Sequence, residues 1–164
     1  MNKNKLRLKK HILIITQLNP KLQIGGTSII MNNLLSAFDD NDFSVIYFNY
    51  FKMSYNDKEK FKNSVKVLGK FSIYHLLGKI NPDIKTNFEI RKILKFISKN
   101  KIDLIVGIYP TIKSLNISYK VAKICNIKFI PYFHDLPYHS LPKELRTKEL
   151  KVLEKDILRD SYKI

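Results

Sequence analysis

The chain offers little sulfur chemistry, because Cys125 is its one cysteine among 164 residues. A single thiol excludes an intrachain disulfide and fits a protein that folds in a reducing compartment. Cys125 lies in an apolar helical stretch, where a small core residue is expected rather than a reactive thiol. The spacing of Cys125 and the histidines does not match that of metal ligands, so we expect no metal site. The histidines are His11, His75, His134 and His139.

Long apolar runs are also missing. Several basic residues near the N-terminus are followed by an apolar run from Ile12 to Ile15 only. This run is too short for the core of a signal peptide or for a membrane span. We therefore expect a cytoplasmic protein, whose membrane contact would be limited to its surface and peripheral at the inner face of the membrane.

Acidic residues are scarce. There are 14 of them against 30 Lys and Arg, for a formal charge of +16, and four of the basic residues are arginine. A surface of this charge attracts phosphate-rich partners such as nucleotide sugars, anionic lipid headgroups or nucleic acid. The alternative is a compositional bias, because the chain is also rich in Ile and Asn, as AT-rich coding sequences tend to be. Few arginines argue against readout of base edges, so nucleic acid is the least expected of these partners.

The sequence does have a regular alternation of short apolar runs and helical periodicity. Nearly unbroken apolar runs are typical of strands covered on both faces of a parallel sheet. These runs are Ile12–Thr16, Ser44–Asn49, Val65–Leu68, Asp103–Ile108 and Ile127–Tyr132. The helical patterns cover Ser28–Phe38, Ile73–Lys79, Asn87–Asn100, Lys113–Asn126 and Lys143–Asp160. The alternation predicts one α/β domain over residues 1–164, with a doubly wound parallel sheet.

The helix predicted over Asn87–Asn100 has two distinct faces. Its apolar stripe consists of Ile90, Ile93, Leu94 and Ile97. On another face, Arg91, Lys95 and Lys99 repeat every four residues. This basic row is either a solvated helix face or a contact for an anionic membrane surface, and both interpretations stay open.

Open α/β sheets bind ligands at the carboxyl ends of their strands, near the point where the strand order reverses. After the first predicted strand, the segment Gln17–Thr27 contains Gly25 and Gly26, whose missing side chains let a ligand approach the backbone. We expect Thr27 or Ser28 to cap the helix that follows, so that backbone N–H groups face an anion. An ordinary turn would explain the glycines equally well.

The better-known nucleotide motifs are absent. No G-x-G-x-x-G occurs, and the second predicted strand ends without the acidic residue that a dinucleotide ribose needs. Neither Gly69-Lys70 nor Gly78-Lys79 is followed by Ser or Thr, which excludes a P-loop. We therefore expect no bound cofactor.

Two further strand ends carry residues suited to a cleft. His134 and Asp135 follow the fifth predicted strand, where an imidazole could donate to a sugar hydroxyl or take part in proton transfer. The alternative is that they only shape a turn. At the end of the fourth predicted strand, Gly107 permits close packing and Tyr109 could line the same cleft.

Together these segments resemble the N-terminal domain of a GT-B glycosyltransferase of the family-4 kind. The resemblance covers nearly the whole chain. It rests on the opening strand Lys-Lys-His-Ile-Leu-Ile-Ile-Thr, the Gly-Gly that leads into the helix Ile29–Phe38, and the segments Ile102–Gly107 and Phe129–Asp135. It implies a Rossmann-like domain that mainly holds the acceptor, opposite a second domain that holds the nucleotide sugar.

The resemblance also implies residue roles and a reaction. Gly25 and Gly26 would approach the donor diphosphate or a phosphorylated acceptor through their backbone amides. His134 would contact the transferring sugar as the catalytic residue. The implied reaction is transfer of a hexose-type unit, with retention, from a nucleotide sugar to a polysaccharide or lipid-linked acceptor. The implied substrate-binding residues are Gly25, Gly26, Thr27, Tyr109, Thr111 and Asp135.

One part of the family pattern is absent. The donor side carries a pair of glutamates eight residues apart, and no two glutamates of this chain have that separation. We expect the chain to be an acceptor-side half, truncated before the donor-binding domain. Its transferase activity would be negligible unless a separate chain supplies that domain, because transfer needs a closed, largely dry cleft. The alternative function is a basic, non-enzymatic module that binds an anionic membrane surface or nucleic acid.

Overall fold

The computed structural model describes residues 10–17, 20–22, 25–48, 62, 64–66, 82–109, 111–133, 138 and 142–161. Five parallel strands form one sheet in the order β3-β2-β1-β4-β5. They are β1 (Ile12–Thr16), β2 (Phe43–Tyr47), β3 (Ser64–Lys66), β4 (Leu104–Ile108) and β5 (Lys128–Tyr132). The helices are α1 (Gly25–Leu35), α3 (Pro82–Ile97), α4 (Ile112–Cys125) and α6 (Lys148–Asp160), with short 3-10 turns η1 (Pro20–Leu22) and η2 (Lys143–Leu145). The predicted doubly wound, Rossmann-like α/β fold is confirmed.

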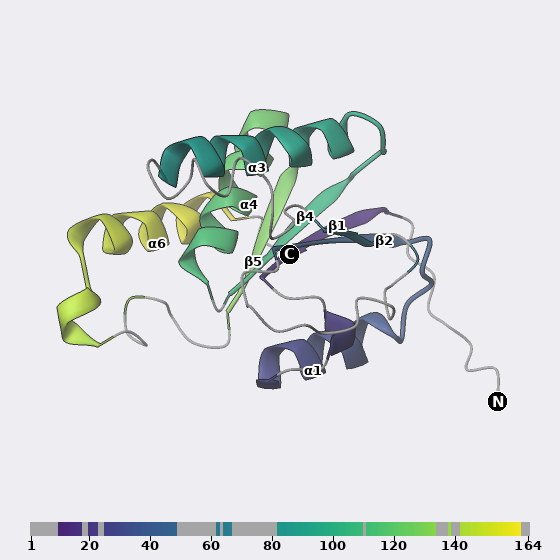
Figure 1. Cartoon of the computed structure of the whole chain (residues 1–164), viewed down its shortest axis with the longest axis horizontal. Coiled ribbons are helices and arrows are strands. Elements are labelled where there is room, and N and C mark those ends of the chain that lie inside the picture. Colours follow the sequence, from purple (N-terminus) through teal and green to yellow (C-terminus); the bar gives the residue numbers. More distant parts are fainter. Residues whose placement is uncertain are drawn as a thin grey trace.

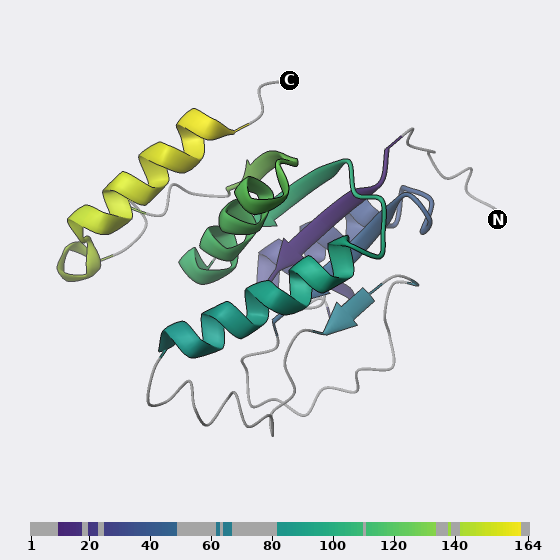
Figure 2. The same ribbon diagram turned by 90° about the horizontal axis from the view of Figure 1, so that it is seen from above.

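Helices cover both faces of the sheet. α3 and α4 lie on one face and α1 lies on the other (Figure 1). Seen from above, α4 lies between α3 and α6 (Figure 2), and α6 packs beside β5. Because α1 follows β1 and α4 follows β4, the chain leaves these two neighbouring strands towards opposite faces. The strand order therefore reverses between β1 and β4.

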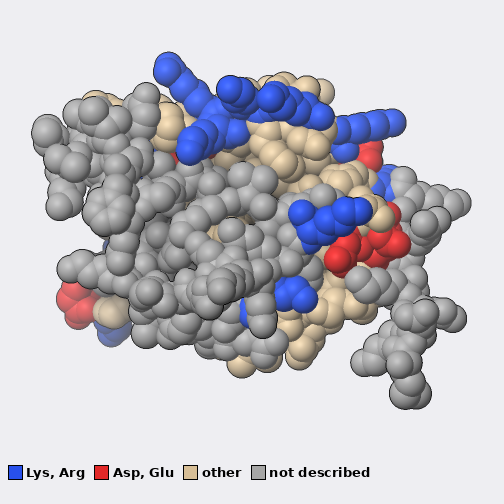
Figure 3. Space-filling model, turned by 45° about the vertical axis from the view of Figure 1, so that its right-hand side comes forward, with Lys and Arg blue, Asp and Glu red and all other residues tan. Residues whose placement is uncertain are grey.

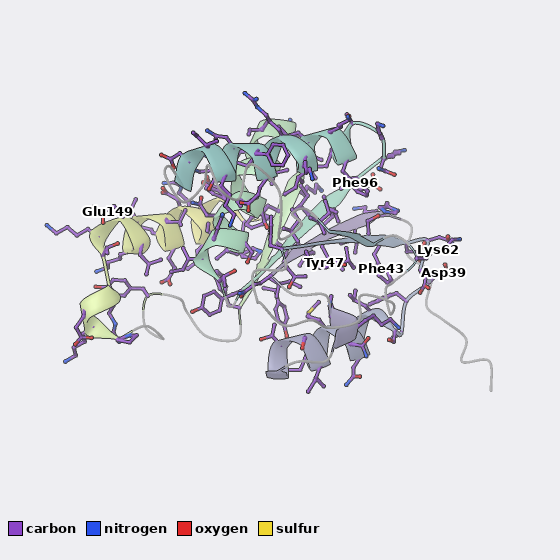
Figure 4. All side chains as sticks on the ribbon, viewed as in Figure 1. Asp39, Phe43, Tyr47, Lys62, Phe96 and Glu149 are labelled. Carbon is purple, nitrogen blue, oxygen red and sulfur yellow. The ribbon has the colours of Figure 1, made fainter. Side chains whose placement is uncertain are left out.

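Alternate residues of the strands fill two separate cores, as the two-residue period of a strand requires. Leu13 and Ile15 of β1 pack towards α3 and α4, whereas Ile14 packs towards α1. Phe43 and Tyr47 of β2 also lie on the α1 side (Figure 4). Both faces are buried, which explains why the strands form nearly unbroken apolar runs in the sequence.

α4 approaches β4 closely at Gly107. A Cβ atom on Gly107 would lie 2.8 Å from the Cβ of Ser118 and 2.9 Å from Cε2 of Phe129. Such distances are shorter than real Cβ contacts, so a glycine is needed here. Ser118 is fully buried, and its hydroxyl donates to the carbonyl of Ser114 at 2.6 Å. The expected role of Gly107 in close packing is confirmed.

The strand boundaries agree with the predicted ones more closely than the helix boundaries do. Every strand begins within one residue of its predicted start. α3 begins at Pro82, earlier than predicted, because proline is pre-organised for the first helical position. The helix predicted over Lys143–Asp160 is divided into η2 and α6, since Thr147 caps α6 through its side-chain oxygen. The predicted helix Ile73–Lys79 lies outside the described residues.

β5 forms one edge of the described sheet. The carbonyl of Tyr132 accepts a hydrogen bond from the N–H of Tyr109 at 3.0 Å, so the backbone groups of Tyr132 face β4. By alternation along the strand, the backbone of Pro131 faces the outer edge. Its missing N–H therefore removes no hydrogen bond from the sheet.

We expect Gly107→Ala to lower the free energy of unfolding by about 1–3 kcal/mol, because the added methyl group would overpack the contact with Ser118. Urea unfolding followed by circular dichroism measures the effect. Gly26→Ala is the matched control, since a Cβ at Gly26 meets no atom within 4 Å. In the control, a helical glycine is replaced by a better helix former, which should raise stability by about 0.5–1 kcal/mol. Equal destabilisation by the two substitutions would contradict the close approach of α4.

Candidate functional site

The carboxyl ends of all five strands lie at one edge of the sheet, because the strands are parallel. At this edge α1 and α4 diverge to opposite faces, between β1 and β4. Open α/β sheets form their ligand crevice at such a reversal of strand order. The register pairs Ile15 of β1 with Gly107 of β4, so the segments that follow these strands start side by side. The segments carrying Gly25, Gly26, Tyr109 and Thr111 thus leave the sheet at one edge.

α1 begins at Gly25, so Gly25 and Gly26 belong to its first turn instead of a preceding loop. The prediction that Thr27 or Ser28 caps this helix is wrong, because both residues lie inside its first turn. The first N–H groups of a helix have no acceptor within it, and they carry the positive end of the helix dipole. Gly26 is exposed, and a Cβ there would meet no atom within 4 Å. The start of α1 therefore has room for a phosphate or another anion.

Tyr109 and Phe133 join the ends of β4 and β5. The N–H of Tyr109 donates to the carbonyl of Tyr132 at 3.0 Å, and the ring centroids of Tyr109 and Phe133 are 6.4 Å apart. Tyr109 is only 8% exposed, so most of its surface belongs to the protein interior. Its predicted role in lining a cleft is therefore limited to the small exposed part. Phe133 directly precedes His134 and Asp135, which lie outside the described residues.

Thr111 is the N-cap of α4. Its Oγ1 accepts a hydrogen bond from the N–H of Ser114 at 3.4 Å and lies 2.7 Å from the hydroxyl of Ser114. The Ser114 hydroxyl also donates to the carbonyl of Ile108 at 3.1 Å, which ties the cap to the end of β4. The side chain predicted to line the acceptor side thus has a structural role in the fold.

An ion pair beside the same edge was not predicted from the sequence. Glu89 of α3 is fully buried, and Lys113 in the first turn of α4 places its Nζ 2.8 Å from the carboxylate. Lys85 lies one helical turn before Glu89, and burial, followed by the charge of Lys113, lowers the pKa of Lys85. With Asp83 in the first turn of α3, the two lysines and two acids at this end of α3 and α4 balance in charge, and the ammonium group of Lys113 lies beside the start of α4. The sequence does contain a signal for the burial of this carboxylate, because Glu89 is an acidic residue on an otherwise apolar helix face, four residues after Lys85.

A hollow of about 640 Å³ lies at the opposite, amino edge of the sheet, where α4 ends, β5 begins and α6 ends. The Tyr119 hydroxyl donates to the carboxylate of Asp160 at 2.6 Å, and Lys123 Nζ lies 3.2 Å from the same oxygen. Arg159 Nε contacts the other oxygen of Asp160 at 2.8 Å. These contacts join α4 to α6. No predicted site residue lines this hollow, so we do not assign the candidate site to it.

The described residues provide neither a metal site nor a membrane span. No three of their His, Cys, Asp and Glu side chains gather closely enough to hold a metal ion. His11, the one histidine in the described ranges, lies with Nε2 2.9 Å from the hydroxyl of Ser44. No helix in the described part of the chain has both the length and the apolar character needed to cross a bilayer.

Comparison with known proteins relates the chain to others by fold. No protein-family model and no curated protein matches the sequence. The UDP-GlcNAc 2-epimerase from Methanocaldococcus jannaschii superposes with a TM-score of 0.55 and 18% identity, over 90% of this chain and 37% of that chain. The sucrose-phosphate synthase from Thermosynechococcus elongatus gives a TM-score of 0.54 and 13% identity, over 93% of this chain and 41% of that chain.

Both structural neighbours are GT-B-type enzymes. The chain shares the Rossmann-like fold of one part of them. It spans less than half the length of either neighbour. At this level of identity the similarity shows the fold alone, so the family-4 relationship and the site residues stay predictions.

We expect Asp160 to make the stability of the chain sensitive to acid. Hydrogen bonds from Arg159, then from Tyr119 and Lys123, hold the pKa of Asp160 well below its usual value. A carboxyl group whose pKa is lowered by folding stabilises the native state above its unfolded pKa of about 3.9, and this contribution is lost as the pH falls below that value. The urea midpoint should therefore fall between about pH 5 and pH 2, and it should fall less in Asp160→Asn.

The control for this experiment is Glu144→Gln, which removes an exposed carboxylate from η2. Its urea midpoint should decrease with acid as much as that of the unmodified chain. If Asp160→Asn and the unmodified chain gave the same pH dependence, the contacts that Asp160 makes with α4 would not contribute to stability.

Proposed function

We propose that the chain is the acceptor-side domain of a nucleotide-sugar-dependent GT-B glycosyltransferase of the family-4 kind. The reversal of strand order between β1 and β4 carries this proposal, because it brings the glycine-rich start of α1 and the capped start of α4 to one edge. A crevice formed at this edge would be bordered by two helix N-termini, which suits a ligand that carries phosphate and sugar groups. The GT-B-type neighbours support the proposal through their shared fold.

The first turn of α1 would bind phosphate. The N–H groups of Gly25, Gly26 and Thr27 would face the donor diphosphate or a phosphorylated acceptor, and the space beside Gly26 leaves room for that group. From the other face of the sheet, the partly exposed ammonium group of Lys113, which pairs with Glu89, would lie near the start of α4. A phosphate bound there would thus meet the dipole of α1 on one side and the ammonium group of Lys113 on the other.

The remaining predicted residues would act on the sugars. His134 would contact the transferring sugar as the catalytic residue, with Asp135 beside it. Tyr109 would contribute its small exposed part to the acceptor side. Thr111 would act by fixing the start of α4, as its capping contacts indicate. The proposed reaction is transfer of a hexose-type unit to a polysaccharide or lipid-linked acceptor.

Catalysis would need a second wall around the crevice. Glycosyl transfer requires donor and acceptor to be held together in a largely dry cleft. We propose that a donor-binding domain provides this wall, either in the same polypeptide or as a separate chain. The span of 37% and 41% of the two neighbours is compatible with such a division.

The substitution Gly26→Asp tests phosphate binding at the start of α1 without destabilising the fold. The new side chain has space, and an acidic residue in the first turn of a helix is stabilising by about 0.3–1 kcal/mol. Its negative charge should nevertheless repel a phosphate at the same place and weaken binding of UDP by at least about tenfold. An NMR titration of the isotope-labelled chain with UDP measures this, and the amides of Gly25, Gly26 and Thr27 should shift in the unmodified protein.

Gly26→Asn is the matched control, because asparagine has nearly the same size as aspartate and no charge. Its side chain takes up part of the space beside Gly26, so it should bind UDP more weakly than the unmodified chain but clearly more tightly than the Asp variant. The proposal is wrong if UDP leaves the first-turn amides of α1 unshifted, or if the Asp and Asn variants bind UDP equally well.

A further inference from the structure

The exposed face of α3 and the turn that follows it carry a row of basic residues, Arg91 and Lys95 in the helix and Lys99 after its end, that form no ion pair with a described acid. Arg91, Lys95 and Lys99 are exposed and follow one another at intervals of four residues. None of them takes part in an ion pair within the described ranges. The one acid between Ile84 and Lys99 is Glu89, which is fully buried and paired with Lys113. We call Arg91, Lys95 and Lys99 the basic stripe.

Apolar side chains continue the basic stripe towards the start of α3. Ile84 is 41% exposed. Phe88 is half-buried, and Lys92 Nζ lies 5.1 Å from the centre of its ring. With 3.6 residues per turn, Ile84 and Phe88 share a face with the stripe. The exposed face of α3 is therefore basic along most of its length and apolar at its N-terminal end.

The other basic helices have more of their charge in ion pairs. α4 carries three lysines and no acid, but Lys113 pairs with Glu89 and Lys123 pairs with Asp160. α6 carries four basic residues but also four acidic ones, and Arg159 pairs with Asp156 and Asp160. In the space-filling view, Lys and Arg gather along the top of the molecule, which is the side of α3 (Figure 3). What distinguishes the basic stripe is therefore that its cations lie together on one exposed side and have no ion-pair partner among the described residues.

We infer that the basic stripe is a docking surface for an anionic lipid bilayer. It extends for about 12 Å along the outward side of α3 and the turn after it, which suits a flat surface better than a groove. Two of its three cations are lysines, and lysine binds headgroup phosphates as a point charge without the planar geometry that base readout favours. Ile84 would meet the boundary between headgroups and acyl chains, whereas Phe88 packs partly against the protein core.

Docking through the basic stripe would also place the candidate site near the membrane. α3 leads from the carboxyl edge of the sheet back towards the start of β4, so Ile84 lies at the end nearest the crevice. A lipid-linked acceptor could then enter the crevice directly from the bilayer. Only this consequence rests on the proposed function; binding to the bilayer does not require it.

Co-sedimentation of the full chain with vesicles tests the inference. The chain should bind vesicles of phosphatidylcholine with phosphatidylglycerol, bind much less to phosphatidylcholine alone, and be released by high salt. Each basic residue near an anionic surface strengthens binding by roughly fivefold, so the triple variant Arg91→Gln, Lys95→Gln, Lys99→Gln should lose on the order of a hundredfold.

A second triple variant provides the matched control. Lys143→Gln, Lys148→Gln and Lys155→Gln remove the same charge from exposed positions on η2 and α6. This variant should keep most of its vesicle binding. Circular dichroism and the urea midpoint of both variants should match those of the unmodified chain, which separates loss of binding from loss of folding.

Three results would overturn the inference. The inference is wrong if the unmodified chain binds both vesicle types equally, or if the two triple variants lose vesicle binding equally. It is also wrong if the stripe variant loses binding to single-stranded RNA but not to vesicles. UDP binding by the stripe variant is an independent measurement. It should be unchanged, because Arg91, Lys95 and Lys99 lie outside the proposed phosphate site, so a failure of one proposal is distinguishable from a failure of the other.

Discussion

The contact between Gly107 and Ser118 sets the depth at which α4 rests on the sheet. Because the helix lies so close to β4, its first turn reaches the end of that strand, where Thr111 caps it. The same depth brings Lys113 within 2.8 Å of Glu89 and so fixes α3 against α4. Glu89 is fully buried, so the ammonium group of Lys113 compensates a carboxylate that water does not reach, and this fixes the register of α3 against α4. One missing methyl group thus determines the position of both helices on this face.

The strands could be predicted well from the sequence, because helices cover both faces of the sheet and every inward position must be apolar. Leu13 and Ile14 point to different cores, yet both are buried. The helix starts were harder to predict, since they depend on single residues. Pro82 and Thr147 start helices through backbone geometry and capping, and the two glycines of α1 resembled a loop because glycine is rare in helices.

The location of the candidate site could be predicted, but the burial and the contacts of its residues could not. Parallel strands bring their carboxyl ends to one edge, which follows from the alternation of strands and helices alone. How much of Tyr109 faces solvent depends on Phe133, which comes from a different strand. Similarly, Glu89 and Lys113 meet only because α3 and α4 pack together, and no periodicity within either helix shows it.

Pro131 has a consequence for the behaviour of the domain at high concentration. An unpaired strand edge is a template to which a second molecule can add its own strand, and this addition begins many forms of aggregation. A foreign strand placed along β5 would find no N–H donor at Pro131, in the middle of the pairing, and would meet the pyrrolidine ring there. The bonds to β4 leave from the opposite side and are intact. A single imino acid therefore protects this edge against self-association without weakening the sheet.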